Sequence, residues 1–230
     1  MIKSIGAILL TVTLYQTIKA LAQRYPKLRL NPLILTTISI IILLALFDVP
    51  VEQYQQDGRL LTNMIAPATI AFAIPVYKHF HTVKRYLGLL MIGTLIGSTV
   101  AILSTLGLAL LFSLDDYLLI SLLPRSITTP FALEMATEIG GVSALAIVFV
   151  IITGLLGVLI SPAIFQVLKI DSPIARGMAL GMAAHAVGTT RALEYGEEAV
   201  TFSTLAMVFA GVITTIFGLT FLPWLINLVL

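Results

Sequence analysis

The sequence contains no cysteine, only three histidines and few charged residues. Without cysteine the chain has no disulfide, no thiolate nucleophile and no cysteine-ligated metal site. Two of the three histidines share one basic loop, so we expect no other metal site either. Charged residues make up 10% of the chain, against about 25% in soluble domains. The net charge of +2 comes from scattered lysines and arginines, which form no phosphate-binding stripe. These absences exclude a soluble enzyme, a disordered protein and a nucleic-acid-binding protein.

Apolar residues dominate instead, at 59% of the chain with a mean hydropathy of +1.07. A helix that crosses the roughly 30 Å hydrocarbon core needs about 20 mostly apolar residues. Six segments are predicted to cross, the third of them interrupted by Pro67 and Pro75: residues 4–20, 30–49, 60–77, 87–113, 142–168 and 199–229. Segments 114–141 and 172–198 are too polar to cross as simple helices and too apolar to be loops. The sequence therefore predicts an all-α polytopic membrane protein with about six transmembrane helices and two re-entrant or broken helical segments.

The positions of lysine and arginine predict the orientation, because cytoplasmic loops are enriched in both. A basic cluster at residues 19–29 follows the first span, which places the N-terminus outside. Basic residues 78–85 and the loop at Lys169 are then cytoplasmic, and the pair Asp115-Asp116 lies outside. The chain must cross the membrane an odd number of times between Asp116, outside, and Lys169, inside. The fifth span supplies one crossing, so segment 114–141 must enter and leave on the same side. We expect the membrane to be the bacterial inner (cytoplasmic) membrane.

The two unusual segments contain an internal repeat. Residues 132–149 and 192–209 are identical at nine of 18 aligned positions, including two pairs of glutamates. Such self-similarity indicates a repeated structural unit, here a hairpin followed by one span. Because a hairpin keeps the side of the membrane and a span reverses it, the second unit is inverted relative to the first. Inverted repeats are typical of secondary transporters, whose binding site lies near the midplane. Two broken helices that cross each other would place the same residues there.

The repeat also predicts the domain organisation. We expect residues 1–113 to form an N-terminal scaffold and residues 114–230 to form a transport core. The core would consist of the two repeat units, residues 114–168 and 172–229.

Two polar stretches lie where the hairpins turn. In the first, Thr129 precedes Pro130 in the pattern of a helix N-terminus. In the second, Gly188 is placed to end the incoming helix and Thr190 to cap the outgoing one. Two helix N-termini would meet at the midplane, where their free N–H groups and dipoles favour an anion. The predicted substrate-binding residues are Arg125, Ser126, Thr128, Thr129, His185, Gly188, Thr189, Thr190 and Arg191, with weaker candidates at Asn63, Pro67 and Thr69.

These residue types have a defined chemistry and also simpler explanations. The two arginines are suited to charge-assisted hydrogen bonds with a carboxylate, although either could reach a lipid headgroup or pair with a glutamate. The threonines would bind a hydroxyl or keto oxygen, or only cross-link neighbouring helices. His185 is either a proton-coupling group or a packed residue. With no nucleophile–base pair and no phosphate loop in the sequence, we expect no enzymatic activity and no cofactor.

Three stretches resemble the signature blocks of the LrgB/CidB family. They are P-R-S-I-T-T-P-F-A-L-E from Pro124, S-P-I-A-R-G-M-A-L-G-M-A-A-H-A-V-G-T-T-R-A from Ser172, and A-P-A-T-I-A-F-A-I-P-V-Y from Ala66. The departures from the family pattern are mild: Ala66 replaces the usual glycine, Val76 a common leucine, and Thr190 a more frequent alanine or serine. Upstream of these blocks, the first two spans match only in hydropathy.

The resemblance implies two functional accounts. One is a holin/antiholin-like modulator of murein hydrolase export and autolysis that acts with a small LrgA/CidA-type membrane partner. The other, known from plastid glycolate/glycerate carriers and bacterial pyruvate uptake, is transport of small monocarboxylates. The opposed helix N-termini and their arginines favour transport. We therefore predict a homo-oligomeric carrier in the lipid bilayer that moves 2-hydroxy or 2-oxo acids, such as pyruvate, lactate or glycolate, by alternating access and binds no nucleic acid.

Overall fold

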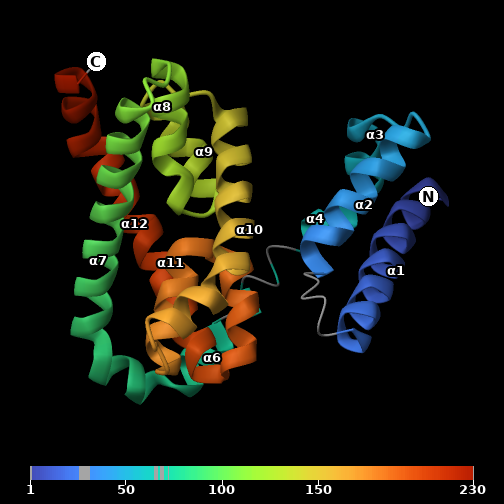
Figure 1. Cartoon of the computed structure of the whole chain (residues 1–230), viewed down its shortest axis with the longest axis horizontal. Helices are drawn as coiled ribbons and strands as arrows, with labels where there is room; N and C mark the ends of the chain where they lie inside the picture. The colour runs from blue at the N-terminus through green and yellow to red at the C-terminus, as the bar shows by residue number, and fades with distance from the viewer. Residues whose placement is uncertain (1, 26–31, 65–66, 68–69, 72, 230) are drawn as a thin grey trace. The chain divides into compact units, whose positions relative to one another are not determined.

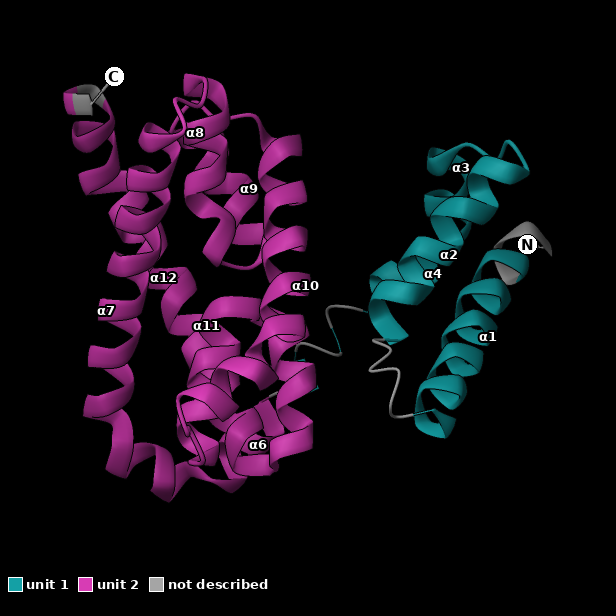
Figure 2. Ribbon diagram, viewed as in Figure 1, with its two compact units in different colours: residues 1–71 teal, residues 72–230 magenta. Residues whose placement is uncertain are grey.

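A computed structural model describes residues 2–25, 32–64, 67, 70–71 and 73–229. Every regular element in this part of the chain is a helix, which confirms the all-α class. The chain forms two compact units, Met1–Ala71 and Phe72–Leu230 (Figure 2). The predicted division into a scaffold and a transport core concerns roles in transport, and it stays a prediction.

Unit 1 contains the first two predicted spans. Its helices are α1 (Ile2–Arg24), α2 (Pro32–Leu46), α3 (Val51–Asp57) and α4 (Arg59–Asn63). α1 packs against α2 and α3, and a hydrogen bond of 2.7 Å between the hydroxyls of Thr11 and Tyr54 joins α1 to α3. α2 has only 15 residues, so it is about 22 Å long at 1.5 Å per residue. This helix is apolar but shorter than the hydrocarbon core.

The third predicted span, 60–77, is not one helix. α4 ends at Asn63 in unit 1, whereas α6 (Ala73–Lys78) belongs to unit 2. Pro67 lies in unit 1, and Thr69 lies outside the described residues. The segment is therefore interrupted, as the two prolines in its sequence predict.

Unit 2 is organised around three long helices, α7 (Phe80–Leu111), α10 (Ser143–Val167) and α12 (Glu197–Val229). Among the described residues these three are long and apolar enough to cross a membrane. They correspond to the predicted spans 87–113, 142–168 and 199–229. Many of their outward side chains are large and apolar, such as Ile92 on α7 and Leu159 on α10. Such a surface suits contact with lipid hydrocarbon.

Two broken segments pack between these helices (Figure 1). The first comprises α8 (Asp116–Leu122), the 3₁₀ helix η2 (Leu123–Ser126) and α9 (Thr129–Glu138). It lies at the end of unit 2 where α7 finishes and α10 begins. The second comprises α11 (Pro173–Ala192), which contains non-helical backbone at His185, and η3 (Leu193–Tyr195). It lies at the opposite end, where α10 finishes and α12 begins.

Contacts at the base of each segment show that both are hairpins. In the first, the Val142 N–H after α9 donates to Ser121 Oγ on α8 over 2.7 Å. In the second, the Arg176 guanidinium near the start of α11 stacks on the Tyr195 ring, 5.0 Å from its centroid. Gly196, at φ 103°, then reverses the chain into α12. Each segment thus returns to the end at which it began.

Close backbone packing fixes the second hairpin on α12. Gly177 and Gly181 lie so near the backbone of Ala199 and Ser203 that a side chain at either glycine would overlap it. On the α7 side, by contrast, Gly93 and Gly97 face only the flexible ends of Met178 and Met182. The hairpin is therefore held to α12 by its backbone and to α7 by adaptable side chains.

We expect Gly181→Ala to destabilise the protein by about 1–3 kcal/mol, because the α11 and α12 backbones would have to separate. Gly107 on α7 provides a matched control, since a Cβ there meets no atom within 4 Å. Gly107→Ala should be neutral or stabilise by up to about 1 kcal/mol, through the higher helix propensity of alanine. Thermal unfolding midpoints in detergent measure both effects. Equal midpoints for the two variants would contradict the close packing.

Candidate functional site

A layer that contains polar groups crosses unit 2 near the middle of its three long helices, between apolar clusters. One cluster contains Ile102 of α7, Val150 of α10 and Leu222 of α12. Towards the other end, Leu90 of α7 packs with Phe202, and Phe165 of α10 packs with Leu180. Between these clusters, near the middle of each long helix, lie Ser98 on α7, Gly154 on α10 and Thr214 on α12. The two hairpins break at this depth.

His185 forms the break in the second hairpin. Its backbone has φ 53° and ψ −132°, which interrupts the helix between an incoming and an outgoing half. The side chain is 5% exposed. Gly154 and Gly157 of α10 face the break, and a Cβ on Gly157 would lie 2.9 Å from the Ala183 carbonyl oxygen. The sequence places two glycines at mid-helix because the irregular backbone must approach α10 closely.

Arg125 and Ser126 form the end of η2 in the first hairpin, and they face His185. Arg125 Nε donates to Thr105 Oγ1 of α7 over 2.9 Å, and Thr105 donates in turn to its own helix at the Ala101 carbonyl, over 2.6 Å. The His185 ring lies beside the Ser126 backbone and close enough to the Arg125 guanidinium for the charge to act on it. The tips of the two hairpins therefore meet.

Two helices begin in this layer and run towards opposite ends of unit 2. α9 follows Thr128, whose backbone is extended and whose hydroxyl caps no N–H, with Pro130 in the first turn. The outgoing half of α11 begins directly after His185. The first N–H groups of a helix have no partner within it, and they carry the positive end of its dipole. Both helix N-termini thus lie on the two hairpins whose tips are in contact.

The charge of the layer is positive. In the described part of the chain no carboxylate forms an ion pair with Arg125; the described ion pairs all lie elsewhere in unit 2. Two side-chain atoms near this depth, Ser98 Oγ and His185 Nε2, are buried without a hydrogen-bond partner among the described residues. A guanidinium, two helix N-termini and unpaired polar atoms favour a small anion that also carries hydrogen-bonding groups.

The structure places the other predicted residues of the second hairpin away from its tip. Gly188 does not end the incoming helix: it lies in the outgoing half and packs against the Leu180 backbone. Thr190 is not a cap, because it is exposed and donates to the Ala186 carbonyl of its own helix. Both placements were wrong because the backbone breaks three residues earlier, at His185, and glycine serves here for close packing.

Arg191 is also further from the tip than predicted. It lies six residues beyond His185, about 9 Å along a helix, and its Nη1 pairs with Glu194 Oε1 at 2.6 Å. Thr189 is buried and shares a hydrogen bond of 2.9 Å with Ser203 of α12. Their placement at the tip is wrong, while a role for either residue in substrate binding stays a prediction.

Some residues of the layer have no signal in the sequence. Ser98 and Thr105 are two of several serines and threonines on a long apolar helix, where such hydroxyls normally bond only to their own backbone. Gly154 resembles any packing glycine. Only the meeting of the two hairpins shows that these residues share a layer with Arg125 and His185.

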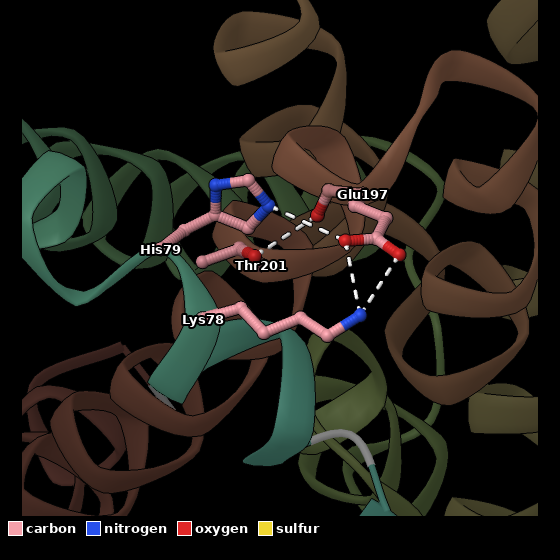
Figure 3. A network of polar contacts seen from close by, with 4 residues as sticks. All are labelled: Lys78, His79, Glu197 and Thr201. Carbon is pink, nitrogen blue, oxygen red and sulfur yellow. Dashed lines mark hydrogen bonds and ion pairs between the residues drawn. The ribbon is translucent and has the colours of Figure 1, made fainter.

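A separate polar network lies at the end of unit 2 where α12 begins (Figure 3). Lys78 Nζ is 3.2 Å from Glu197 Oε1, and His79 Nε2 is 3.6 Å from Glu197 Oε2. Thr201 Oγ1 donates to the Glu197 carbonyl over 2.9 Å. The network joins α6 to the start of α12, next to the base of the second hairpin. Its exposed ion pairs contribute little stability by themselves.

We expect Thr105→Val to destabilise the protein by roughly 1–3 kcal/mol, because it leaves the half-buried Arg125 Nε without an acceptor. Thr99 on the same helix is the matched control, since it is half-buried and donates to the Leu95 carbonyl of its own helix. Thr99→Val should stay within about 0.5 kcal/mol of the unmodified protein. Thermal unfolding in detergent compares them, and an equal effect of both variants would show that Thr105 does not hold Arg125.

Comparison with known proteins agrees with the sequence blocks. A model of the LrgB-like family matches residues 11–226, so the match extends into the first two predicted spans, which the sequence blocks alone had related to the family only in hydropathy. The chain is 42% identical to YwbG of Bacillus subtilis over 210 residues, which cover 91% of this chain and 93% of YwbG. It is 30% identical over 215 residues to the holin-like protein CidB of Staphylococcus aureus, with 94% of each chain covered. No solved structure matches. The chain therefore belongs to the LrgB family of membrane proteins.

Proposed function

We propose that this protein is a carrier that moves small monocarboxylates, namely 2-hydroxy or 2-oxo acids, across the membrane by alternating access. The observation that carries the proposal is that Arg125, His185 and two helix N-termini share one layer, where no carboxylate among the described residues forms an ion pair with Arg125. Such a site attracts an anion into a low-dielectric layer. The proposal includes no enzymatic step.

The arrangement of the two hairpins supports alternating access. Each hairpin is followed by a long apolar helix, and the two hairpins lie at opposite ends of unit 2 (Figure 1). We interpret this order, together with the repeat between residues 132–149 and 192–209, as an inverted repeat. In carriers of that architecture the two halves move against each other around a site at the midplane.

The charges favour a monocarboxylate. A guanidinium binds a carboxylate through two parallel hydrogen bonds, and Arg125 uses only Nε in its contact with Thr105. The second arginine, Arg191, is paired with Glu194. Among the described residues of this layer, Arg125 is a cation without an ion-pair partner, and its one charge matches one carboxylate. The Thr128 and Thr129 hydroxyls at the N-terminus of α9 are further donors.

The names of relatives favour a second candidate function. CidB of Staphylococcus aureus, at 30% identity, is called holin-like. By that analogy this protein would modulate murein hydrolase export and autolysis together with a small LrgA/CidA-type membrane partner. A holin-like assembly predicts leakage of a trapped dye without saturation, whereas a carrier predicts saturable exchange and retention of the dye.

Counterflow into liposomes tests the carrier. We expect saturable exchange of labelled lactate, pyruvate or glycolate by the protein alone or with its small partner, and no dye leakage. Arg125→Gln should raise the KM about 10- to 100-fold, since a charge-assisted contact is worth roughly 1.5–3 kcal/mol. Arg85→Gln is the matched control, because Arg85 is exposed on α7 and contacts the Tyr86 ring. Dye leakage, or no saturable exchange of any of the three acids, would contradict the carrier.

Arg191→Gln tests whether Arg191 binds the substrate carboxylate as Arg125 is proposed to do. Because Arg191 is partly exposed and paired with Glu194, we expect its removal to change the KM less than threefold, about 0.65 kcal/mol or less. The measurement is counterflow of the same acids. An effect as large as that of Arg125→Gln would show that both arginines bind the carboxylate.

A further inference from the structure

We propose that His185 Nε2 accepts a hydrogen bond from the hydroxyl on carbon 2 of the substrate, so that the site prefers 2-hydroxy monocarboxylates over 2-oxo and unsubstituted ones. The inference rests on the proposed carrier function, and it assigns the selectivity of that site to one residue.

The first observation is the unpaired nitrogen. His185 is 5% exposed, and its Nε2 has no hydrogen-bond partner among the described residues. Buried polar atoms in folded proteins are nearly always paired, and an exception needs an explanation. A ligand that supplies the missing partner explains it, because the nitrogen lies in the layer where the two hairpin tips meet.

The second observation concerns which ring nitrogen carries the proton. The ring lies beside the Ser126 backbone, whose carbonyl can accept from Nδ1, whereas Nε2 has no partner among the described residues. A ring nitrogen donates its proton to a carbonyl, which leaves a lone pair on Nε2 of a neutral imidazole. Burial of the ring in this apolar layer, and then the nearby Arg125 guanidinium, disfavour a second positive charge there. Nε2 is therefore an acceptor.

The third observation is backbone strain. His185 is held at φ 53°, in a region that glycine adopts freely and that is costly for residues with a side chain. Glycine at this position would form the same break without strain. A histidine kept here in spite of that cost indicates that its side chain, rather than its backbone, is needed.

One small acid fits these groups. Its carboxylate binds Arg125, and its carbon 2 is the atom next to the carboxylate. A hydroxyl on carbon 2 donates to Nε2, whereas a keto oxygen would set one acceptor against another, and an unsubstituted acid leaves Nε2 unpaired. Sites that bind a substrate hydroxyl reject analogues that lack it strongly. We expect at least a tenfold preference for lactate and glycolate over pyruvate and propionate.

The test is competition for counterflow in liposomes that contain the full chain. The half-inhibitory concentrations of lactate, glycolate, pyruvate and propionate against labelled lactate are measured for the unmodified protein, His185→Gly and His185→Gln. The glycine variant relieves the strain and removes the imidazole, so it stays folded and should lose the preference, with all four acids within about threefold. The His185→Gln variant should keep part of the preference for 2-hydroxy acids, because the glutamine side-chain carbonyl accepts a hydrogen bond.

The outcomes separate the inference from the carrier function. If no acid shows saturable exchange with the unmodified protein, the carrier function itself fails. If exchange is saturable but pyruvate or propionate competes as well as lactate, the inference is wrong and the carrier function stands. An unchanged ranking in His185→Gly, or an equal loss for all four acids, also overturns it. The ranking measured on the unmodified protein decides the matter even where a variant does not fold.

Discussion

The interrupted backbone at mid-depth is the constraint on which the rest of unit 2 depends. In hydrocarbon, every backbone N–H and C=O must find a partner within the protein, so a broken helix is tolerated only where other elements surround it. The breaks after Ser126 and at His185 meet this condition. α7 supplies Thr105 to hold Arg125, and α10 supplies glycines that let the second break come close. Three long helices around two hairpins are the consequence.

The same constraint explains how the interior is divided. Apolar clusters fill unit 2 on both sides of the breaks, because regular helix leaves no free backbone groups there. Polar side chains collect between the clusters, where the free helix N-termini need partners. The described carboxylates of unit 2 lie instead towards the ends of its helices, as in the pair of Lys78 with Glu197. Arg125 is thus left as a central cation.

The packing around the second hairpin differs between its two sides, and the difference bears on motion. Backbone contact and the hydrogen bond between Thr189 and Ser203 hold it to α12. Only methionine ends fill the space against the glycines of α7. A movement between α7 and the second hairpin would therefore disturb side chains alone, whereas separating the hairpin from α12 would break backbone contacts.

Composition, apolar length and local signals by themselves determined that this is an all-α membrane protein with two interrupted segments and a first hairpin tip at Arg125 to Thr129. They predicted six spans, of which three are helices long and apolar enough to cross a membrane among the described residues. Pro130 and the threonines are short-range signals, and a helix start depends mainly on such neighbours. The second tip was decided by tertiary structure. Gly188 satisfies the local rule for a helix end, yet the chain uses it for close packing and breaks at His185, which no short-range rule favours. The place of Gly154 beside the second tip likewise depends on how distant segments pack, and hydropathy carries no information on that.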